Sequence, residues 1–148
     1  HGKFRRQRQM CIRDSPKDYP LTSKIYSKFK GKKKIIGICL GFQQILFCEG
    51  AKIVEQKKIY HGFQSNIKVT NDKSLFKKGK KFKVGRYHSL KLKEPFKNKD
   101  FEITMRCLES NVAMSIENKK DKIYGFQFHP ESFLTNNGNL LIKKILSA

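Results

Sequence analysis

The sequence lacks the segments that mark membrane and secreted proteins. No apolar run approaches the roughly 20 residues that cross a bilayer, and no apolar stretch follows the arginine-rich first residues as it would in a secretory signal. Tryptophan is absent, and the four cysteines (Cys11, Cys39, Cys48 and Cys107) form no CxxC pair and no regular framework. We therefore expect a cytoplasmic protein with reduced thiols, no metal and no membrane partner.

Acidic residues are also scarce, with 12 Asp and Glu against 33 Lys and Arg, for a formal net charge of +21. Such a charge raises the hypothesis of a nucleic-acid-binding protein. Four of the six arginines lie within residues 1–15, however, and the lysines beyond are scattered without a basic helix. This scatter favours a solvated surface over a nucleic-acid interface. Residues 1–15 show no helical or strand period, so we interpret them as a foreign or disordered front, excluded from the fold.

Residues 16–148 have enough Phe, Ile and Leu to bury one core, and their length suits one domain. Hydrophobic periodicity and turn residues predict helices at 40–49 and 137–147. They also predict strands at 34–38, 51–56, 65–70, 81–86, 101–108, 112–117 and 122–128. This order predicts an α/β core with a β-rich insertion.

The segment Gly37-Ile38-Cys39-Leu40-Gly41 falls at the predicted turn from strand to helix. This is the pattern of a nucleophile elbow, in which a strained turn presents the nucleophile at the edge of the sheet. The helix N-terminus favours a thiolate at Cys39, and the backbone N–H of Leu40 is placed to hold an oxyanion. The alternative is a small buried residue between two packing glycines.

The segment Gly125-Phe-Gln-Phe-His-Pro-Glu-Ser132 places a histidine and a carboxylate just past a buried strand. A cysteine nucleophile needs a base, and the base needs a group that orients it. Cys39, His129 and Glu131 are therefore a candidate catalytic triad, provided that parallel strands end at the same sheet edge. The alternative for His129 is a capping residue in a loop.

The blocks GICLGFQQI, His61-Gly62, VGRYHSL (84–90) and FHPESFLTNNGNLL (128–141) together resemble the class I, triad-type glutamine amidotransferases. They are most similar to the amidotransferase component of anthranilate synthase and aminodeoxychorismate synthase. The resemblance covers about residues 16–148 and implies a flavodoxin-like three-layer fold. It also implies hydrolysis of L-glutamine to glutamate and ammonia through a cysteinyl thioester, without a cofactor. The ammonia would pass to a chorismate-binding synthase subunit, for tryptophan or folate biosynthesis.

The resemblance also assigns roles to single residues. Cys39 becomes the nucleophile, His129 the general base and acid, and Glu131 the group that orients His129. The expected glutamine-binding residues are Leu40, Gln43, Ser89 and Leu90. The alternatives are an exposed helix residue for Gln43, and a turn with a core leucine for Ser89-Leu90.

Other residues near these blocks have weaker assignments. His61-Gly62 is a candidate contact with the synthase partner or an ordinary turn. Tyr87 and His88 are expected to be structural, and Cys48 and Cys107 to lie in the core.

The sequence departs from the family before residue 16. Residues 15–20 (SPKDYP) resemble only the tail of the family's glycine-rich loop, which supplies a further oxyanion N–H. We therefore expect a domain truncated at its N-terminus, with exposed sheet edges that favour aggregation. Losing one oxyanion donor typically lowers the rate about 10²–10³-fold. The competing hypotheses are an impaired, amidotransferase-like module that binds a partner and, with less support, a basic nucleic-acid-binding protein.

Overall fold

The computed structural model describes residues 15–148, so the arginine-rich front and Cys11 lie outside the described residues. The described part of the chain begins with η1 (Pro16–Asp18), α2 (Pro20–Phe29), β1 (Ile35–Ile38) and α3 (Leu40–Cys48). The strands β2 (Ile53–Glu55), β3 (Phe63–Val69), β4 (Lys81–Arg86), β5 (Leu90–Leu92), β6 (Glu102–Cys107), β7 (Ala113–Asn118) and β8 (Ile123–Phe126) follow. The chain closes with α4 (Gly138–Ser147).

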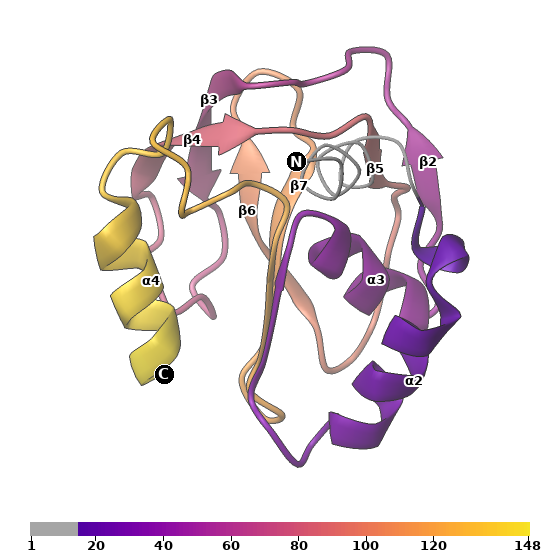
Figure 1. Cartoon of the computed structure of the whole chain (residues 1–148). Coiled ribbons are helices and arrows are strands. Elements are labelled where there is room, and N and C mark those ends of the chain that lie inside the picture. The colour runs from indigo at the N-terminus through magenta and orange to yellow at the C-terminus, as the bar shows by residue number, and fades with distance from the viewer. Residues whose placement is uncertain (1–14) are drawn as a thin grey trace, which may run out of the picture.

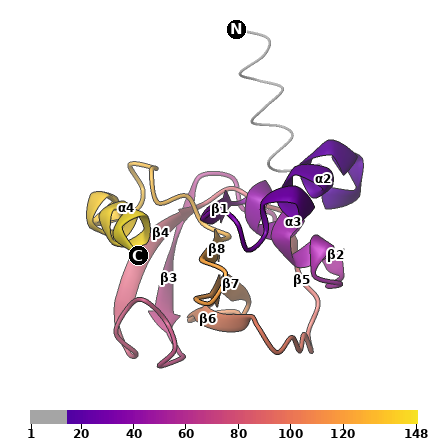
Figure 2. The ribbon, with the colours of Figure 1, turned by 90° about the horizontal axis from the view of Figure 1, so that it is seen from below.

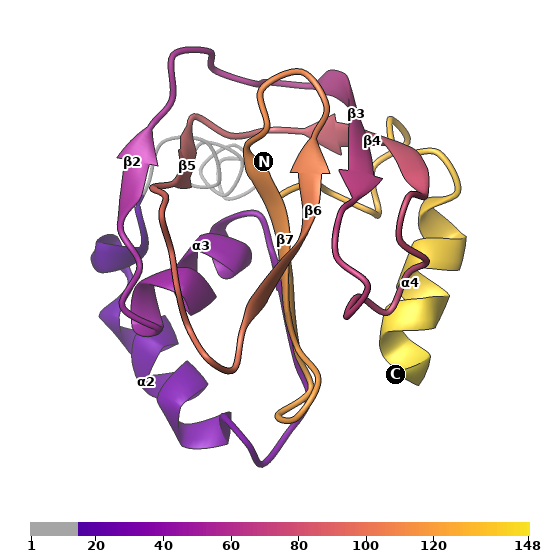
Figure 3. The same cartoon turned by 180° about the vertical axis from the view of Figure 1, so that it is seen from behind.

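Six strands form the main sheet in the order β1-β8-β7-β6-β3-β4. β2 and β5 form a separate antiparallel pair (Figures 1 and 3). β1 and β8 run parallel, whereas the β8–β7, β7–β6, β6–β3 and β3–β4 pairs are antiparallel. The strands β2 to β7 all lie between α3 and β8 in the chain. They are the β-rich insertion that the sequence predicts.

Helices cover the two faces of the sheet, which gives three layers (Figure 2). On one face, Leu141 and Ile145 of α4 join the core formed by β3, β4, β6 and parts of β7 and β8. On the other face, Phe42 and Leu46 of α3 pack with residues of α2, β7 and β8. Successive side chains of β8 point to opposite faces of the sheet. Ile123 belongs to the second core, which lies against α2 and α3, and Tyr124 to the first core, which lies against α4. The expected three-layer α/β architecture is confirmed.

Most predicted elements agree with the structure to within two or three residues at each end. The positive φ of 88° at Gly50 fits the predicted end of α3, because glycine adopts this conformation without strain. Three elements have no counterpart in the prediction, namely η1, α2 and β5. α2 repeats apolar residues at helical spacing (Leu21, Ile25 and Phe29) but buries only Tyr26, and η1 and β5 have only three residues each.

Within residues 15–148, no helix combines the length and the apolar character needed to traverse a lipid bilayer. The same residues hold no cluster of three or more His, Cys, Asp or Glu side chains suited to a metal ion.

Candidate functional site

The turn between β1 and α3 has the geometry of a nucleophile elbow. Cys39 adopts φ 56° and ψ −105°, a conformation that non-glycine residues rarely occupy and that stores strain of about 1–3 kcal/mol. Gly37 makes this sharp turn possible, because a Cβ there would come within 2.6 Å of the carbonyl carbon and oxygen of Gly41. Cys39 therefore stands at the N-terminus of α3, immediately before Leu40, as the sequence predicts.

The parallel pairing of β1 with β8 brings the two motifs together. Ile38 pairs with Phe126, and the N–H of Cys39 extends the ladder by donating to the carbonyl of Phe126 at 2.8 Å. The chain after β8 then passes beside the end of β4, where the N–H of His129 donates to the carbonyl of Gly85 at 3.0 Å. Cys39 and His129, which are 90 positions apart, therefore follow the ends of two neighbouring parallel strands at the same edge of the sheet.

His129 and Glu131 form a hydrogen-bonded pair, with 2.5 Å between Nδ1 and Oε1. Burial raises the pKa of Glu131, but the hydrogen bond from His129, a backbone hydrogen bond and the charge of His129 outweigh it and lower this pKa overall. The Nε2 atom of His129 is buried and has no hydrogen-bond partner within the described chain. A carboxylate that fixes Nδ1–H leaves Nε2 as the atom able to accept a proton.

The Cys39 side chain is fully buried between two polar groups. Its Sγ donates to the carbonyl of Tyr87 at 3.6 Å, and the Nε2 of Gln127 donates to Sγ at 3.8 Å. The Oε1 of Gln127 in turn accepts a hydrogen bond from Nε2 of Gln43 at 3.1 Å. Cys39 thus has polar neighbours, while its full burial beside the closely packed Gly37 also fits the alternative of a small buried residue.

The predicted glutamine-binding residues divide into two groups. Gln43 is 1% exposed, so the alternative of an exposed helix residue is wrong, and its Oε1 is buried with no hydrogen-bond partner in the described structure. Ser89 and Leu90 follow Tyr87 in the chain, and their carbonyls accept hydrogen bonds from Gln56 and His88. Leu90 is also a core leucine in β5, which agrees with its alternative interpretation.

Tyr87 lies closer to the site than sequence reasoning allowed. Its ring meets that of His129 edge-on at 5.1 Å, and its hydroxyl is hydrogen-bonded to Ser132 at 3.1 Å. Tyr87 therefore contacts Cys39 through its carbonyl and His129 through its ring. The sequence held a signal for this position, because Tyr87 stands inside the block that also supplies Ser89.

A buried cation supports the segment after β4. Arg86 is fully buried, with its guanidinium 3.6 Å from the ring centre of Tyr60 and its Nε donating to Nε2 of His88 at 2.9 Å. Burial, followed by the charge of Arg86, lowers the pKa of His88 to about 3. His88 is therefore neutral, and its Nδ1 donates to the carbonyl of Leu90 at 2.8 Å. The structural role expected for His88 is confirmed.

The remaining singled-out residues lie around this site. Cys107 is buried in the first core, and Cys48 is half-buried against the second, as expected. The ring of His61 is exposed and meets that of Tyr87 edge-on at 6.4 Å. The segment at His61-Gly62 therefore covers part of Tyr87 at the rim of the site.

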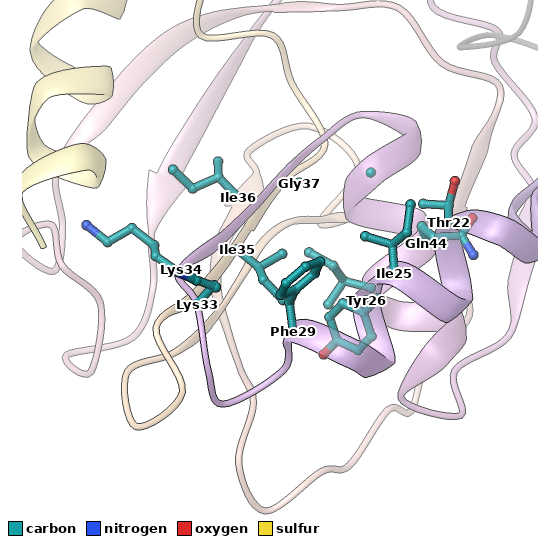
Figure 4. A pocket seen from close by; sticks show the side chains of 12 residues that line it. Thr22, Ile25, Tyr26, Phe29, Lys33, Lys34, Ile35, Ile36, Gly37 and Gln44 are labelled. Carbon is teal, nitrogen blue, oxygen red and sulfur yellow. The ribbon is translucent and has the colours of Figure 1, made fainter.

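An apolar groove of about 540 Å³ runs beside the free edge of β1 (Figure 4). Ile25 and Phe29 of α2, Ile35 and Ile36 of β1, and Gly41 of α3 are among its lining residues. β1 pairs only with β8 among the described strands, so this groove follows an unpaired strand edge. Its lining includes Gly37 and Gly41 on either side of the elbow, but neither Cys39 nor His129.

Residues 14–148 match the family model "Glutamine amidotransferase class-I". Anthranilate synthase component 2 of Lactococcus lactis is 38% identical over 133 residues, which are 89% of this chain and 67% of that protein. The Bifunctional protein TrpGD of Thermotoga maritima is also 38% identical over 133 residues, but the chain covers only 22% of it. A solved structure of a glutamine amidotransferase from Thermotoga maritima has the same fold, with a TM-score of 0.60 and 21% identity over 77% of this chain and 46% of that one.

The family model spans all but the first 13 residues, and the L. lactis relative exceeds 30% identity over two thirds of its own length. The chain belongs to the class I glutamine amidotransferases.

Proposed function

We propose that the chain hydrolyses L-glutamine to glutamate and ammonia through a thioester on Cys39. The observations that carry this proposal are a strained cysteine at a helix N-terminus and, past the end of the neighbouring parallel strand, a histidine whose Nδ1 is held by a carboxylate. Family membership supports the same reaction. The site needs no metal or organic cofactor for this chemistry, because thiol, imidazole and carboxylate suffice for acyl transfer.

In the proposed mechanism, His129 Nε2 takes the proton from Cys39 Sγ, and the thiolate attacks the side-chain carboxamide carbon of glutamine. The backbone N–H of Leu40 donates to the oxyanion of the tetrahedral intermediate. When the C–N bond breaks, His129 returns the proton to the leaving nitrogen, and ammonia departs. Water then attacks the thioester with His129 as base, which releases glutamate and restores the thiol. Glu131 keeps His129 in the required tautomer throughout.

Gln43 and the segment at Ser89-Leu90 are the proposed glutamine contacts. Gln43 supplies a buried Oε1 without a partner in the described structure, an acceptor that a substrate N–H would satisfy. Ser89 and Leu90 offer backbone groups on a segment whose carbonyls are held by Gln56 and His88. These residues would position the carboxamide rather than react with it.

The names of the relatives point to the acceptor of the ammonia. Anthranilate synthase component 2 is by its name one component of a synthase, so we propose that the partner is a chorismate-binding synthase subunit. The proposed pathway is tryptophan biosynthesis, with aminodeoxychorismate synthase and folate biosynthesis as the second candidate because the two share these motifs. His61 and Tyr87, at the rim of the site, are the proposed contacts with that partner.

The test measures glutamate and ammonia release from L-glutamine, with and without a synthase subunit of the anthranilate type. Activity that disappears in Cys39→Ser but persists in Cys48→Ser, a matched thiol on the same helix, is the expected result. Activity that survives in Cys39→Ser contradicts the proposal. A chain that forms a stable complex with the synthase subunit yet releases no ammonia in either state favours the alternative of an impaired partner-binding module.

A further inference from the structure

The side chain of Gln127 donates a hydrogen bond to Sγ of Cys39. Gln127 lies between Phe126 and Phe128, two core residues, and is itself fully buried. Its backbone N–H donates to the carbonyl of Met114 at 2.9 Å, which fixes the main chain on β7. The side chain is thereby directed at the end of β1, where its Nε2 lies 3.8 Å from Sγ.

A second glutamine fixes which way the amide of Gln127 faces. Nε2 of Gln43 donates to Oε1 of Gln127 at 3.1 Å, and in this arrangement the amide presents its N–H side to Cys39. Both side chains are at least 98% buried, which protects these contacts from competition by water. The carbonyl of Tyr87, on the other side of Sγ, can only accept and so favours the thiol over the thiolate.

We propose that Gln127 stabilises the thiolate of Cys39, and that Gln43 acts on the nucleophile through Gln127 as well as on the substrate. The inference rests on the proposed role of Cys39 as the nucleophile. When His129 removes the thiol proton, the hydrogen bond to Tyr87 is lost and the one from Gln127 becomes charge-assisted. The pair of glutamines thus connects the substrate-binding side of α3 with the reacting sulfur.

The test is the rate of Cys39 alkylation by iodoacetamide as a function of pH, because only the thiolate reacts. The Cys48→Ser background leaves Cys39 as the single thiol of tryptic peptide 35–52, whose modification mass spectrometry then quantifies. Gln127→Met keeps the length and burial of the side chain but removes the donor. We expect its alkylation rate near neutral pH to fall about tenfold. This factor corresponds to the low end of the free energy of a hydrogen bond to a charged group, because the N–S distance is long.

Gln43→Met reports on the orienting contact, and Gln44→Met is its matched control. Gln44 is the neighbouring buried glutamine of α3, but its Nε2 donates to Ser23 on α2, away from Cys39. We expect Gln43→Met to slow alkylation several-fold, with little further effect in the Gln43→Met/Gln127→Met double variant, and Gln44→Met to leave the rate unchanged.

An unchanged pH profile in Gln127→Met, with a far-UV circular dichroism spectrum like that of the parent, overturns the proposal. An unchanged profile in Gln43→Met overturns the link between the two glutamines. Should Gln127→Met not fold, Gln127→Glu retains the shape and an acceptor for Gln43, and a rate no lower than that of the parent contradicts the proposal. Alkylation requires no turnover, so absent glutamine hydrolysis would refute the proposed function without deciding this inference.

Discussion

Gly37 and Gly41 flank Cys39 symmetrically in the sequence, but only one of the two positions lacks room for a side chain in the structure. A Cβ at Gly37 would lie 2.6 Å from two backbone atoms of Gly41 and 2.7 Å from Cδ1 of Ile45. Backbone cannot give way as a flexible side chain does, so Gly37→Ala must displace β1 from α3. A Cβ at Gly41 meets nothing within 4 Å in the described structure, and Gly41 lies within the first turn of α3.

We therefore expect Gly37→Ala to lower the free energy of unfolding by about 2–3 kcal/mol, the upper part of the range for overpacking. At about 3–4 °C per kcal/mol for a chain of this size, the Tm falls by roughly 6–12 °C. Gly41→Ala should leave stability unchanged or raise it by up to about 1 kcal/mol, because alanine is the better helix former. Thermal and urea unfolding followed by circular dichroism measure both. Equal stability of the two variants would refute the assignment of the close approach to Gly37.

Three further predictions concern the site and the sheet edge. Cys39→Gly should be more stable than Cys39→Ala by about 1–2 kcal/mol, because only glycine relieves the strain at φ 56°; the opposite order in urea unfolding would contradict it. The lowered pKa of Glu131 contributes stability that is present above the ordinary pKa of a glutamate and is lost as the pH falls through the lowered one. Glu131→Gln should therefore lower the Tm more at pH 7 than at acidic pH, and a pH-independent difference would exclude linkage to the pair with His129. Ile36→Lys, at the free edge of β1, should reduce concentration-dependent self-association in analytical ultracentrifugation, and unchanged association would exclude this edge as its cause.

Much of the site was predictable because its motifs stand at the ends of strongly apolar strands. The runs before Cys39 and His129 identify β1 and β8, and parallel strands end at the same edge. The β-rich segment between them was likewise evident from alternation and turn residues. Local patterns that coincide with buried strands therefore placed Cys39 and His129 at the ends of β1 and β8 without tertiary information.

Contacts made across the fold were beyond such reasoning. Gln127 reads as one inward residue of a buried strand, and only the approach of α3 shows that its amide meets Cys39. Tyr87 read as structural because its carbonyl, which carries no sequence signal, makes the contact to sulfur. The buried state of Gln43 was equally hidden, since a glutamine in an apolar helix predicts solvent exposure. α2, by contrast, carries a helical period in Leu21, Ile25 and Phe29, so this element was open to prediction but was not predicted.

The central claim is that Cys39 is a nucleophile poised for the carboxamide carbon of glutamine. A glutamine analogue with a thiol-reactive group in place of the carboxamide tests it most directly, with the modified residue located by mass spectrometry. The account predicts modification at Cys39, suppression by excess L-glutamine, none in Cys39→Ser, and strong slowing in a His129→Asn variant. Modification of Cys48 or Cys107 in preference to Cys39, or labelling that glutamine does not suppress, would contradict the account.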